Sequence, residues 1–303
     1  MAGTAFVQKL ASAATTSNMK STFPVGDDLS VNRLGFGAMR ITGEGIWGWP
    51  PDRENAKKVL RRAVDLGVNL IDTADAYGPE TSELLIAEAL HPYPKGVVIA
   101  TKGGLTRPGP NNWVPNCRPE YLSQCVDKSL KRLKLDRIDV YQLHTVDRKV
   151  PIEESLGALK KAQDAGKIRH VGLSNVTVQE IERAKKILAI VSVQNRYNIE
   201  DRDSEDVLSY CEKEKMGFLP WAPVGGNGRG SLSKSGNPLE AEAKRHKVTA
   251  VQLGLAWLLQ KSPVMLPIPG TANIAHLEQN MAAAKLQLTA DDWKRIEELA
   301  GKS

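Results

Sequence analysis

The chain has 303 residues, 41% of them hydrophobic and 25% charged, which is the composition of a globular protein with one large domain or two. The formal net charge is +6, but the basic residues are spread through helical patterns beside acidic ones, which argues against a nucleic-acid partner and would still help an anionic cofactor to approach. The sequence contains no apolar run of about 18 residues, so no membrane span is predicted. Its three cysteines include no CxxC pair, which favours a reducing, cytoplasmic compartment.

The N-terminal segment, residues 1–22, is small and polar. Its short apolar stretches are too weak for the hydrophobic region of a signal peptide, so we expect an extended or disordered start, with a transit peptide as the lesser alternative. A β-hairpin is expected around Phe23 to Arg33. It would cap the floor of a single domain that runs over residues 23–303.

Short apolar runs alternate with longer segments of 3.6-residue apolar period, a pattern typical of buried strands and amphipathic helices. The predicted strands are 33–39, 68–74, 97–102, 138–144, 170–175, 190–195, 217–223 and 264–270. The predicted helices are 52–67, 80–91, 118–133, 151–166, 177–188, 203–215, 238–247, 249–261, 273–284 and 289–301. The first helix has Asp52 as a plausible cap and Gly67 as its stop.

Repeated strand–helix alternation predicts parallel strands joined by crossover helices. Eight such units favour an α/β fold of the (β/α)8 TIM-barrel type. An open sheet is less favoured, because the first glycines, Gly35 and Gly37, lack the GxGxxG spacing and no helix follows them. The longer insertions all follow strands, at 40–52, 103–118, 145–152 and 224–238. These insertions would therefore lie at the carboxyl ends of the strands, which is the face that holds the active site in such barrels.

Polar residues stand where consecutive predicted strands end. Asp72 ends the second strand and Tyr77 lies in the loop after it, while Lys102 ends the third strand and His144 the fourth. A buried lysine is costly unless it is paired, and Asp72 can pair with Lys102. The lysine cation would lower the pKa of Tyr77, and His144 could orient a bound carbonyl oxygen. The set predicts a proton donor for a carbonyl being reduced.

Each of these residues alone has an ordinary explanation, as a turn former, a packing residue or a surface charge, and their coincidence at strand ends is what favours a site. Asp75 is read as a loop or turn residue. The other histidines and the cysteines have no metal-ligand spacing, so no metal site is expected. A barrel isomerase or aldolase that uses Lys102 as a Schiff base stays open as an alternative.

Seven motifs that span nearly the whole chain identify it as similar to the aldo-keto reductase superfamily. They are LGFGAM at 34–39, NLIDTADAYG at 69–78, ATKGG at 100–104, QLH at 142–144, GLSN at 172–175, VQNRYN at 193–198 and IPGT…HLEQN at 268–280. The resemblance implies a (β/α)8 fold and NADPH-dependent reduction of aldehydes or ketones. It also implies a catalytic tetrad of Asp72, Tyr77, Lys102 and His144, with Tyr77 as the general acid.

The same resemblance implies a binding site for the cofactor along the strand ends. Ser174, Asn175 and Gln194 would hold the nicotinamide carboxamide, and Trp221 would stack on the ring. A glycine-rich loop would cover the pyrophosphate, and the start of a later helix would meet the adenosine end. The full implied set is Gly37, Ala38, Met39, Asp72, Ser174, Asn175, Gln194, Trp221, Ala222, Pro223, Val224, Gly225, Gly226, Arg229, Gly270, Thr271, Asn273, His276, Gln279 and Asn280.

The sequence departs from the family's commonest pattern at Gly270 and His276, where many members have Lys and Arg to grip the 2′-phosphate. NADP is still expected, with NAD less so. A subgroup resemblance points to bacterial reductases that include pyridoxal reductases. The insertions carry Trp47, Trp49 and Trp113, so an aromatic or flat aldehyde is a plausible substrate.

The expected partner is therefore a small carbonyl compound, and the expected state is a monomer or a weak homo-oligomer. The alternative function is a cofactor-binding interaction or sensor protein, because potassium-channel β subunits share this fold and keep the cofactor site.

Overall fold

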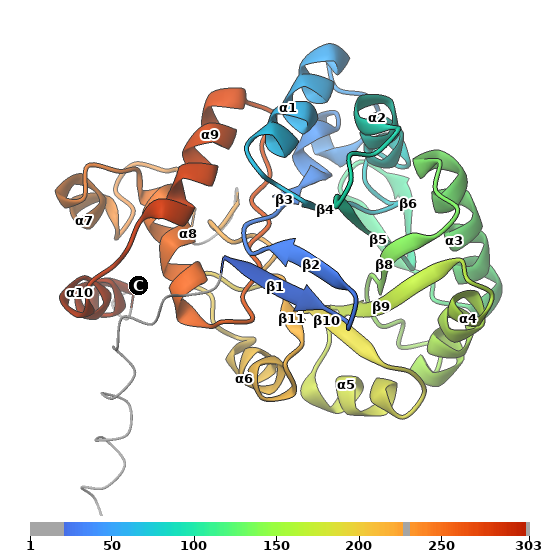
Figure 1. The fold of residues 1–303 in the computed structure, drawn as a ribbon. Coiled ribbons are helices and arrows are strands. Elements are labelled where there is room, and N and C mark those ends of the chain that lie inside the picture. The colour runs from blue at the N-terminus through green and yellow to red at the C-terminus, as the bar shows by residue number, and fades with distance from the viewer. Residues whose placement is uncertain (1–20, 227–230, 301–303) are drawn as a thin grey trace, which may run out of the picture.

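The computed structural model describes residues 21–226 and 231–300. Its main sheet has seven parallel strands, which curl into a barrel with helices around the outside (Figure 1). In spatial order the strands are β11 (Gly217–Phe218), β10 (Ile190–Gln194), β9 (Ile168–Ser174), β8 (Ile138–Leu143), β5 (Val98–Gly103), β4 (Leu70–Asp72) and β3 (Phe36–Gly37). The predicted (β/α)8 fold class is confirmed.

The eighth predicted strand, 264–270, closes the barrel as extended backbone and is not assigned as a strand. Leu266 N–H donates to Phe218 O at 2.8 Å on one side, and Gly35 N–H donates to Pro267 O at 2.9 Å on the other. The run contains two prolines, which have no N–H to donate, so its ladder to the neighbouring strands stays incomplete.

Ten helices connect or flank the strands in the described part of the chain, and each lies inside a predicted range. They are α1 (Arg53–Asp65), α2 (Thr81–Leu90), α3 (Pro119–Leu133), α4 (Ile152–Asp164), α5 (Val178–Lys185), α6 (Glu205–Glu214), α7 (Glu240–Arg245), α8 (Ala250–Lys261), α9 (Ile274–Ala282) and α10 (Ala290–Ala300). The predicted ends of α1 are confirmed, since the Asp52 side chain accepts from Asn55 N–H at 2.8 Å and Gly67 follows the helix with φ +91°.

The expected N-terminal hairpin is present as β1 (Thr22–Val25) paired antiparallel with β2 (Leu29–Asn32), and it crosses one end of the barrel in Figure 1. Its Phe23 ring packs over Gly217 at the start of β11. Thr22, which the sequence assigned to the extended segment, belongs to β1. Ser21 is an exposed residue just before β1, and residues 1–20 lie outside the described residues. So does Arg229, which the resemblance assigned to the cofactor site.

The insertion 103–118 is a second hairpin, which the sequence did not predict. Its strands are β6 (Leu105–Gly109) and β7 (Asn112–Pro115), paired antiparallel. The segment is rich in proline, glycine and asparagine, so its composition indicates a loop, and pairing between its own two halves overrides that tendency. Two short 3₁₀ turns, η1 (Ala38–Ile41) and η2 (Glu44–Ile46), occupy the insertion after β3, and η3 (Ala283–Lys285) follows α9.

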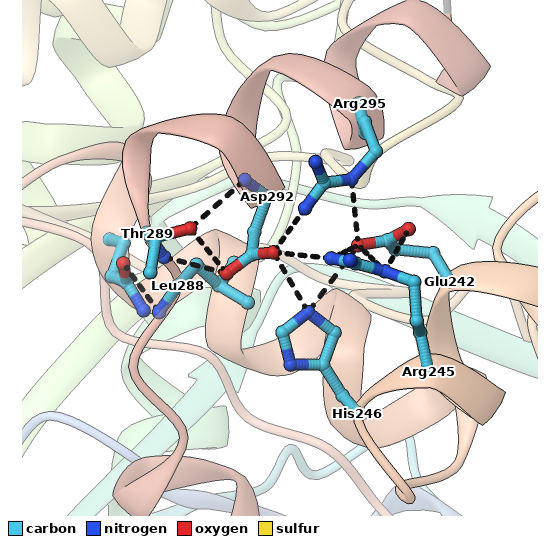
Figure 2. Close-up of polar contacts among 8 residues, drawn as sticks. Glu242, Arg245, His246, Leu288, Thr289, Asp292 and Arg295 are labelled. Carbon is cyan, nitrogen blue, oxygen red and sulfur yellow. Dashed lines mark hydrogen bonds and ion pairs between the residues drawn. The ribbon is translucent and has the colours of Figure 1, made fainter.

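Helices α7 and α10 are joined by a cluster of charges at one edge of the molecule. Figure 2 shows Arg245, Arg295 and His246 converging on the carboxylates of Glu242 and Asp292. The two carboxylates and the imidazole lie close enough to hold a metal ion, but both guanidinium groups already pair with the carboxylates. We therefore read the group as an ionic cluster.

Within residues 21–226 and 231–300, no helix is long and apolar enough to cross a membrane.

Candidate active site

The four predicted tetrad residues meet at the carboxyl ends of neighbouring strands. Asp72 is the last residue of β4, Lys102 lies near the end of β5, and His144 follows β8 directly. These three strands are adjacent in the sheet, so the sequence separation of the residues disappears in the fold. Tyr77 reaches the same place from the loop between β4 and α2, and all four side chains are buried.

Lys102 is the centre of the group and is fully buried. Its ammonium donates to Asp72 Oδ2 at 2.9 Å, to the Thr73 carbonyl at 2.8 Å and to Tyr77 Oη at 3.3 Å. A lysine has three N–H donors, so these three acceptors use all of them. Such a lysine is a fixed cation beside a phenol.

The Asp72 carboxylate has two further partners that the sequence did not indicate. Gln194 Nε2 donates to Asp72 Oδ1 at 2.7 Å, and Gln142 Nε2 approaches the same oxygen at 3.5 Å. Both glutamines are buried and stand on the neighbouring strands β10 and β8. Because a buried carboxylate is costly unless it is paired and hydrogen-bonded, these amides stabilise the ionised Asp72 that Lys102 needs.

The expected lowering of the Tyr77 pKa is wrong. Burial raises the pKa of Tyr77, and the opposing effect of the Lys102 cation does not outweigh it. For Lys102 itself, burial acts to lower the pKa, but the attraction of Asp72 and Tyr77 raises it overall. The phenol therefore keeps its proton and the lysine keeps its charge. This combination suits a residue that must hold a proton until a basic oxygen appears next to it.

His144 is a neutral imidazole. Burial, together with the nearby cations of Lys102 and Arg107, lowers its pKa well below the usual value. Its ring lies edge-on to Tyr77, with 5.7 Å between ring centres, and its Nδ1 is buried with no hydrogen-bond partner among the described residues. A neutral imidazole carries one N–H and can donate it to a bound oxygen.

The three tryptophans predicted to line the substrate site differ in their distance from the tetrad. Trp113, on β7, lies edge-on to Tyr77 at 6.2 Å and to His144 at 6.3 Å. Trp47 is half-buried next to η2. Trp49 is 44% exposed and packs against the Arg53 guanidinium at 3.9 Å, and within the described residues no ring contact links it to the tetrad.

The residues expected around the nicotinamide lie beside the tetrad. Asn175 Nδ2 donates to the His144 carbonyl at 3.0 Å and to Ser174 Oγ at 3.0 Å, and Asn175 Oδ1 accepts from Trp221 Nε1 at 2.9 Å. The Trp221 ring is half-exposed. Gln194 Nε2 donates to Asp72 Oδ1 at 2.7 Å, and its expected contact with the nicotinamide carboxamide stays a prediction.

The backbone around Gly37 and Gly270 is too close for any side chain. A Cβ on Gly270 would lie 2.3 Å from Gly37 O, and one on Gly37 would lie 2.6 Å from Ile268 O. A side chain at Gly270 would therefore require this backbone to move. Arg40, which the sequence did not single out, is exposed beside both Gly270 and Gly226, where its Nη2 is 3.7 Å from a Cβ built on Gly226.

The remaining implied cofactor residues divide between loops and the start of α9. Asn273 caps α9 by accepting from His276 N–H at 3.0 Å, and Thr271 Oγ1 accepts from Asn273 N–H at 3.0 Å. His276 and Gln279 are exposed, whereas Asn280 is buried. Gly225, Pro223 and Ala38 are also buried, and the residues Met39, Ala222, Val224 and Gly226 are half-exposed.

A parallel barrel that holds a phenol against a buried lysine–carboxylate pair at its strand ends, with a neutral imidazole beside it, is the arrangement of a pyridine-nucleotide oxidoreductase. The Aldo/keto reductase family model matches residues 33–300. The chain therefore belongs to the aldo/keto reductase family and is an NAD(P)H-dependent enzyme, which confirms the expected family and enzyme class.

Three comparisons show how near its relatives are. It is 48% identical over 293 residues to an uncharacterized oxidoreductase of Schizosaccharomyces pombe, covering 97% of this chain and 94% of that one. It is 42% identical over 277 residues to pyridoxine 4-dehydrogenase of Escherichia coli, covering 89% and 95%. Its structure matches an aldo-keto reductase from Klebsiella pneumoniae in complex with NADPH, with a TM-score of 0.78, 26% identity and coverage of 93% and 95%.

Proposed function

We propose that this enzyme reduces aldehydes or ketones to alcohols with NADPH, and that Tyr77 is the general acid. The observation that carries the proposal is the contact of 3.3 Å between the Lys102 ammonium and Tyr77 Oη in a buried site. It places a permanent cation against the one side chain of the group that can give up a proton and become an anion.

Bound NADPH supplies a hydride to the carbonyl carbon. Negative charge then develops on the carbonyl oxygen, and Tyr77 donates its proton to that oxygen. The resulting phenolate is stabilised by Lys102, whose charge is in turn held by Asp72. His144, neutral and next to Tyr77, donates a hydrogen bond that orients the oxygen before the transfer.

The chain's own residues suit a dinucleotide. Asn175 and Ser174 stand where a carboxamide can be held beside the tetrad, and the Trp221 ring offers a flat surface to the nicotinamide. The glycine pair Gly37 and Gly270 lets two backbone segments approach closely beside Arg40. Arg40 adds a cation near the glycine loop, where phosphate groups would lie. The NADPH complex of the Klebsiella relative supports NADP over NAD.

We further propose that the substrate is a flat aromatic aldehyde, pyridoxal among them. Trp113 supports this, since its ring lies within 6.3 Å of both Tyr77 and His144 and can pack on an aromatic ring held there. The name of the Escherichia coli relative, a pyridoxine dehydrogenase, describes the same alcohol–aldehyde interconversion run in the oxidising direction. A cytoplasmic location is proposed on the three thiols, all buried and unpaired.

The Schiff-base alternative is disfavoured by the state of Lys102. A nucleophilic amine must lose its proton, whereas all three N–H bonds of Lys102 are donated and its pKa is raised overall. The interaction-protein alternative, of the potassium-channel β-subunit type, makes a different prediction: such a protein binds the cofactor but needs no turnover with free aldehydes.

A panel of aldehydes assayed with NADPH and with NADH tests the proposal. With this enzyme and no partner protein, we expect pyridoxal and benzaldehyde to oxidise NADPH steadily, with one alcohol formed per NADPH. The kcat/KM with NADH should be lower. Tight NADPH binding without turnover on any member of the panel would overturn the proposed reduction of aldehydes.

A further inference from the structure

We propose that Arg107 is a positioning residue that fixes the aromatic wall of the substrate site by holding Trp113 beside Tyr77 and His144. The proposal rests on the function argued above and deepens it, because it names the residue that sets the preference for flat substrates. Arg107 lies on β6, in the hairpin that the sequence did not predict, and it is half-buried.

The guanidinium group joins three separate segments through main-chain carbonyls. Its Nε donates to Asn112 O at 2.9 Å, within its own hairpin. Its Nη1 donates to Ile46 O at 3.1 Å and to Ala76 O at 2.7 Å, and its Nη2 donates to Gly45 O at 3.2 Å. Ala76 directly precedes Tyr77, so one side chain ties the hairpin and the η2 turn to the loop that carries the proposed proton donor.

The same group lies flat against the indole that faces the tetrad. Arg107 Cζ is 3.6 Å from the centre of the Trp113 ring and 5.6 Å from that of Trp47. A guanidinium over an indole face is an attractive contact, and it is stronger where the site is partly shielded from water. Trp113 thus contacts Arg107 through its ring face and also makes T-shaped contacts with Tyr77 and His144.

Lysine could not replace this arginine. Four of the five guanidinium N–H bonds point at carbonyl oxygens on three segments, and the planar group stacks on an indole at the same time. A lysine has its donors on a single nitrogen, so it can keep the charge but cannot reach the separated acceptors. Because nearly all its donors are used by the backbone, Arg107 is placed to shape the site and not to bind the substrate itself.

Two backbone contacts also join the η2 turn to the hairpin and to the loop that carries Tyr77. Gly45 O, which accepts from Arg107, also accepts from Asn111 N–H at 3.3 Å, and Gly48 N–H donates to Gly78 O at 2.6 Å just after Tyr77. Loss of the guanidinium would remove the side-chain bonds between the hairpin and the η2 turn, leaving the backbone bond from Asn111 N–H to Gly45 O, and would let Trp113 move. Flat aromatic aldehydes would lose the surface on which they pack, whereas small aliphatic aldehydes would lose little.

The test compares Arg107→Met and Arg107→Lys with the unchanged enzyme on benzaldehyde and on propionaldehyde. We expect both variants to lower the ratio of kcat/KM for benzaldehyde to that for propionaldehyde by at least tenfold, about 1.4 kcal/mol of selectivity, chiefly through KM for benzaldehyde. Arg61→Met is the matched control, because Arg61 is an exposed arginine that donates to the Ala89 carbonyl between α1 and α2, away from the strand ends. It should leave the ratio unchanged.

A second readout does not depend on turnover. The near-ultraviolet circular dichroism of Arg107→Met should differ from that of the unchanged protein, and this difference should vanish when both carry Trp113→Phe. An unaltered selectivity ratio in a folded Arg107→Met would overturn the proposal, and so would full rescue by lysine. If the unchanged enzyme reduces no aldehyde, the proposed function fails on its own, while the spectroscopic comparison still decides whether Arg107 holds Trp113.

Discussion

Tyr77 keeps its proton in the resting site because burial opposes its ionisation more strongly than Lys102 favours it. This is the opposite of the lowered pKa that the residue types alone suggest. It fits the proposed direction of proton transfer, since a general acid must be protonated when the substrate arrives. At the residue scale, the lysine acts on the product of the transfer, the phenolate, more than on the starting phenol.

Removal of Lys102 should expose the cost of the buried Asp72 carboxylate. We expect Lys102→Met to destabilise the fold by about 3–5 kcal/mol, because an uncompensated charge is left in the barrel. Adding Asp72→Asn should recover part of that loss, since the neutral amide has no charge to bury. Denaturant unfolding of the two variants at pH 7 measures both effects. Equal stability of the single and the double variant would contradict the account of this ion pair.

Asp75, read from the sequence as a turn residue, is buried behind the site. Burial, with the neighbouring Glu83 carboxylate, raises its pKa from 3.8 to about 7. The folded chain therefore binds a proton here more tightly than the unfolded chain, so this group lowers the free energy of unfolding as pH rises from about 4 to 7. Asp75→Asn mimics the neutral form, and it should gain stability over the unchanged protein between pH 5 and pH 8.

The control for that prediction is Asp65→Asn, which changes an exposed aspartate on α1. Its difference from the unchanged protein should be the same at pH 5 and pH 8. Thermal unfolding at both pH values measures these differences in stability. If the difference between Asp75→Asn and the unchanged protein is also independent of pH, the proposed titration of Asp75 is ruled out.

At the scale of elements, the attachment of α10 depends on Asp292. Its carboxylate accepts from Thr289 N–H at 2.8 Å and Thr289 Oγ1 at 2.7 Å at the start of the helix, and it pairs with Arg245 at 2.7 Å (Figure 2). Burial acts to raise the pKa of Asp292, but Thr289, His246 and Arg295 hold it well below its usual range. A lowered pKa contributes stability that is present at neutral pH and lost in acid.

We therefore expect Asp292→Ala to cost about 1–3 kcal/mol at pH 7, through the lost helix cap and the unpaired arginines. The cost should shrink as pH falls from about 4 towards 2, because the unfolded chain of the unchanged protein takes up a proton on this carboxylate in that range while the folded chain still holds it ionised. Urea unfolding at several pH values gives the comparison. A cost that stays constant down to pH 2 would show that the charge of Asp292 contributes nothing.

The helices and the parallel strands could be predicted because their apolar periods are long and repeat regularly. The second hairpin could not, because Leu105–Gly109 and Asn112–Pro115 carry few strand-forming residues and gain order from pairing with each other and from contacts with distant segments. The apolar run placed the eighth strand correctly, but its two prolines, Pro267 and Pro269, keep it from forming a regular ladder of hydrogen bonds.

For the whole molecule, the candidate site is a property of the closed barrel. Strand ends can be read from the sequence, so Asp72, Lys102 and His144 could be assigned to one rim before the structure was known. Their supports could not be predicted: Gln194 was expected at this rim as a cofactor residue but not as a partner of Asp72, and Gln142 and Arg107 were not singled out. Their roles depend on which strands become neighbours and which loops fold over the rim.

The central claim is that Tyr77 gives a proton to the carbonyl oxygen, and Tyr77→Phe tests it most directly. The change removes one oxygen and leaves the ring that packs against Trp113 and His144. We predict that kcat for benzaldehyde with NADPH falls by at least about 100-fold, while the Kd for NADPH from fluorescence titration stays within about twofold. A kcat equal to that of the unchanged enzyme, at the same NADPH affinity, would contradict the mechanism.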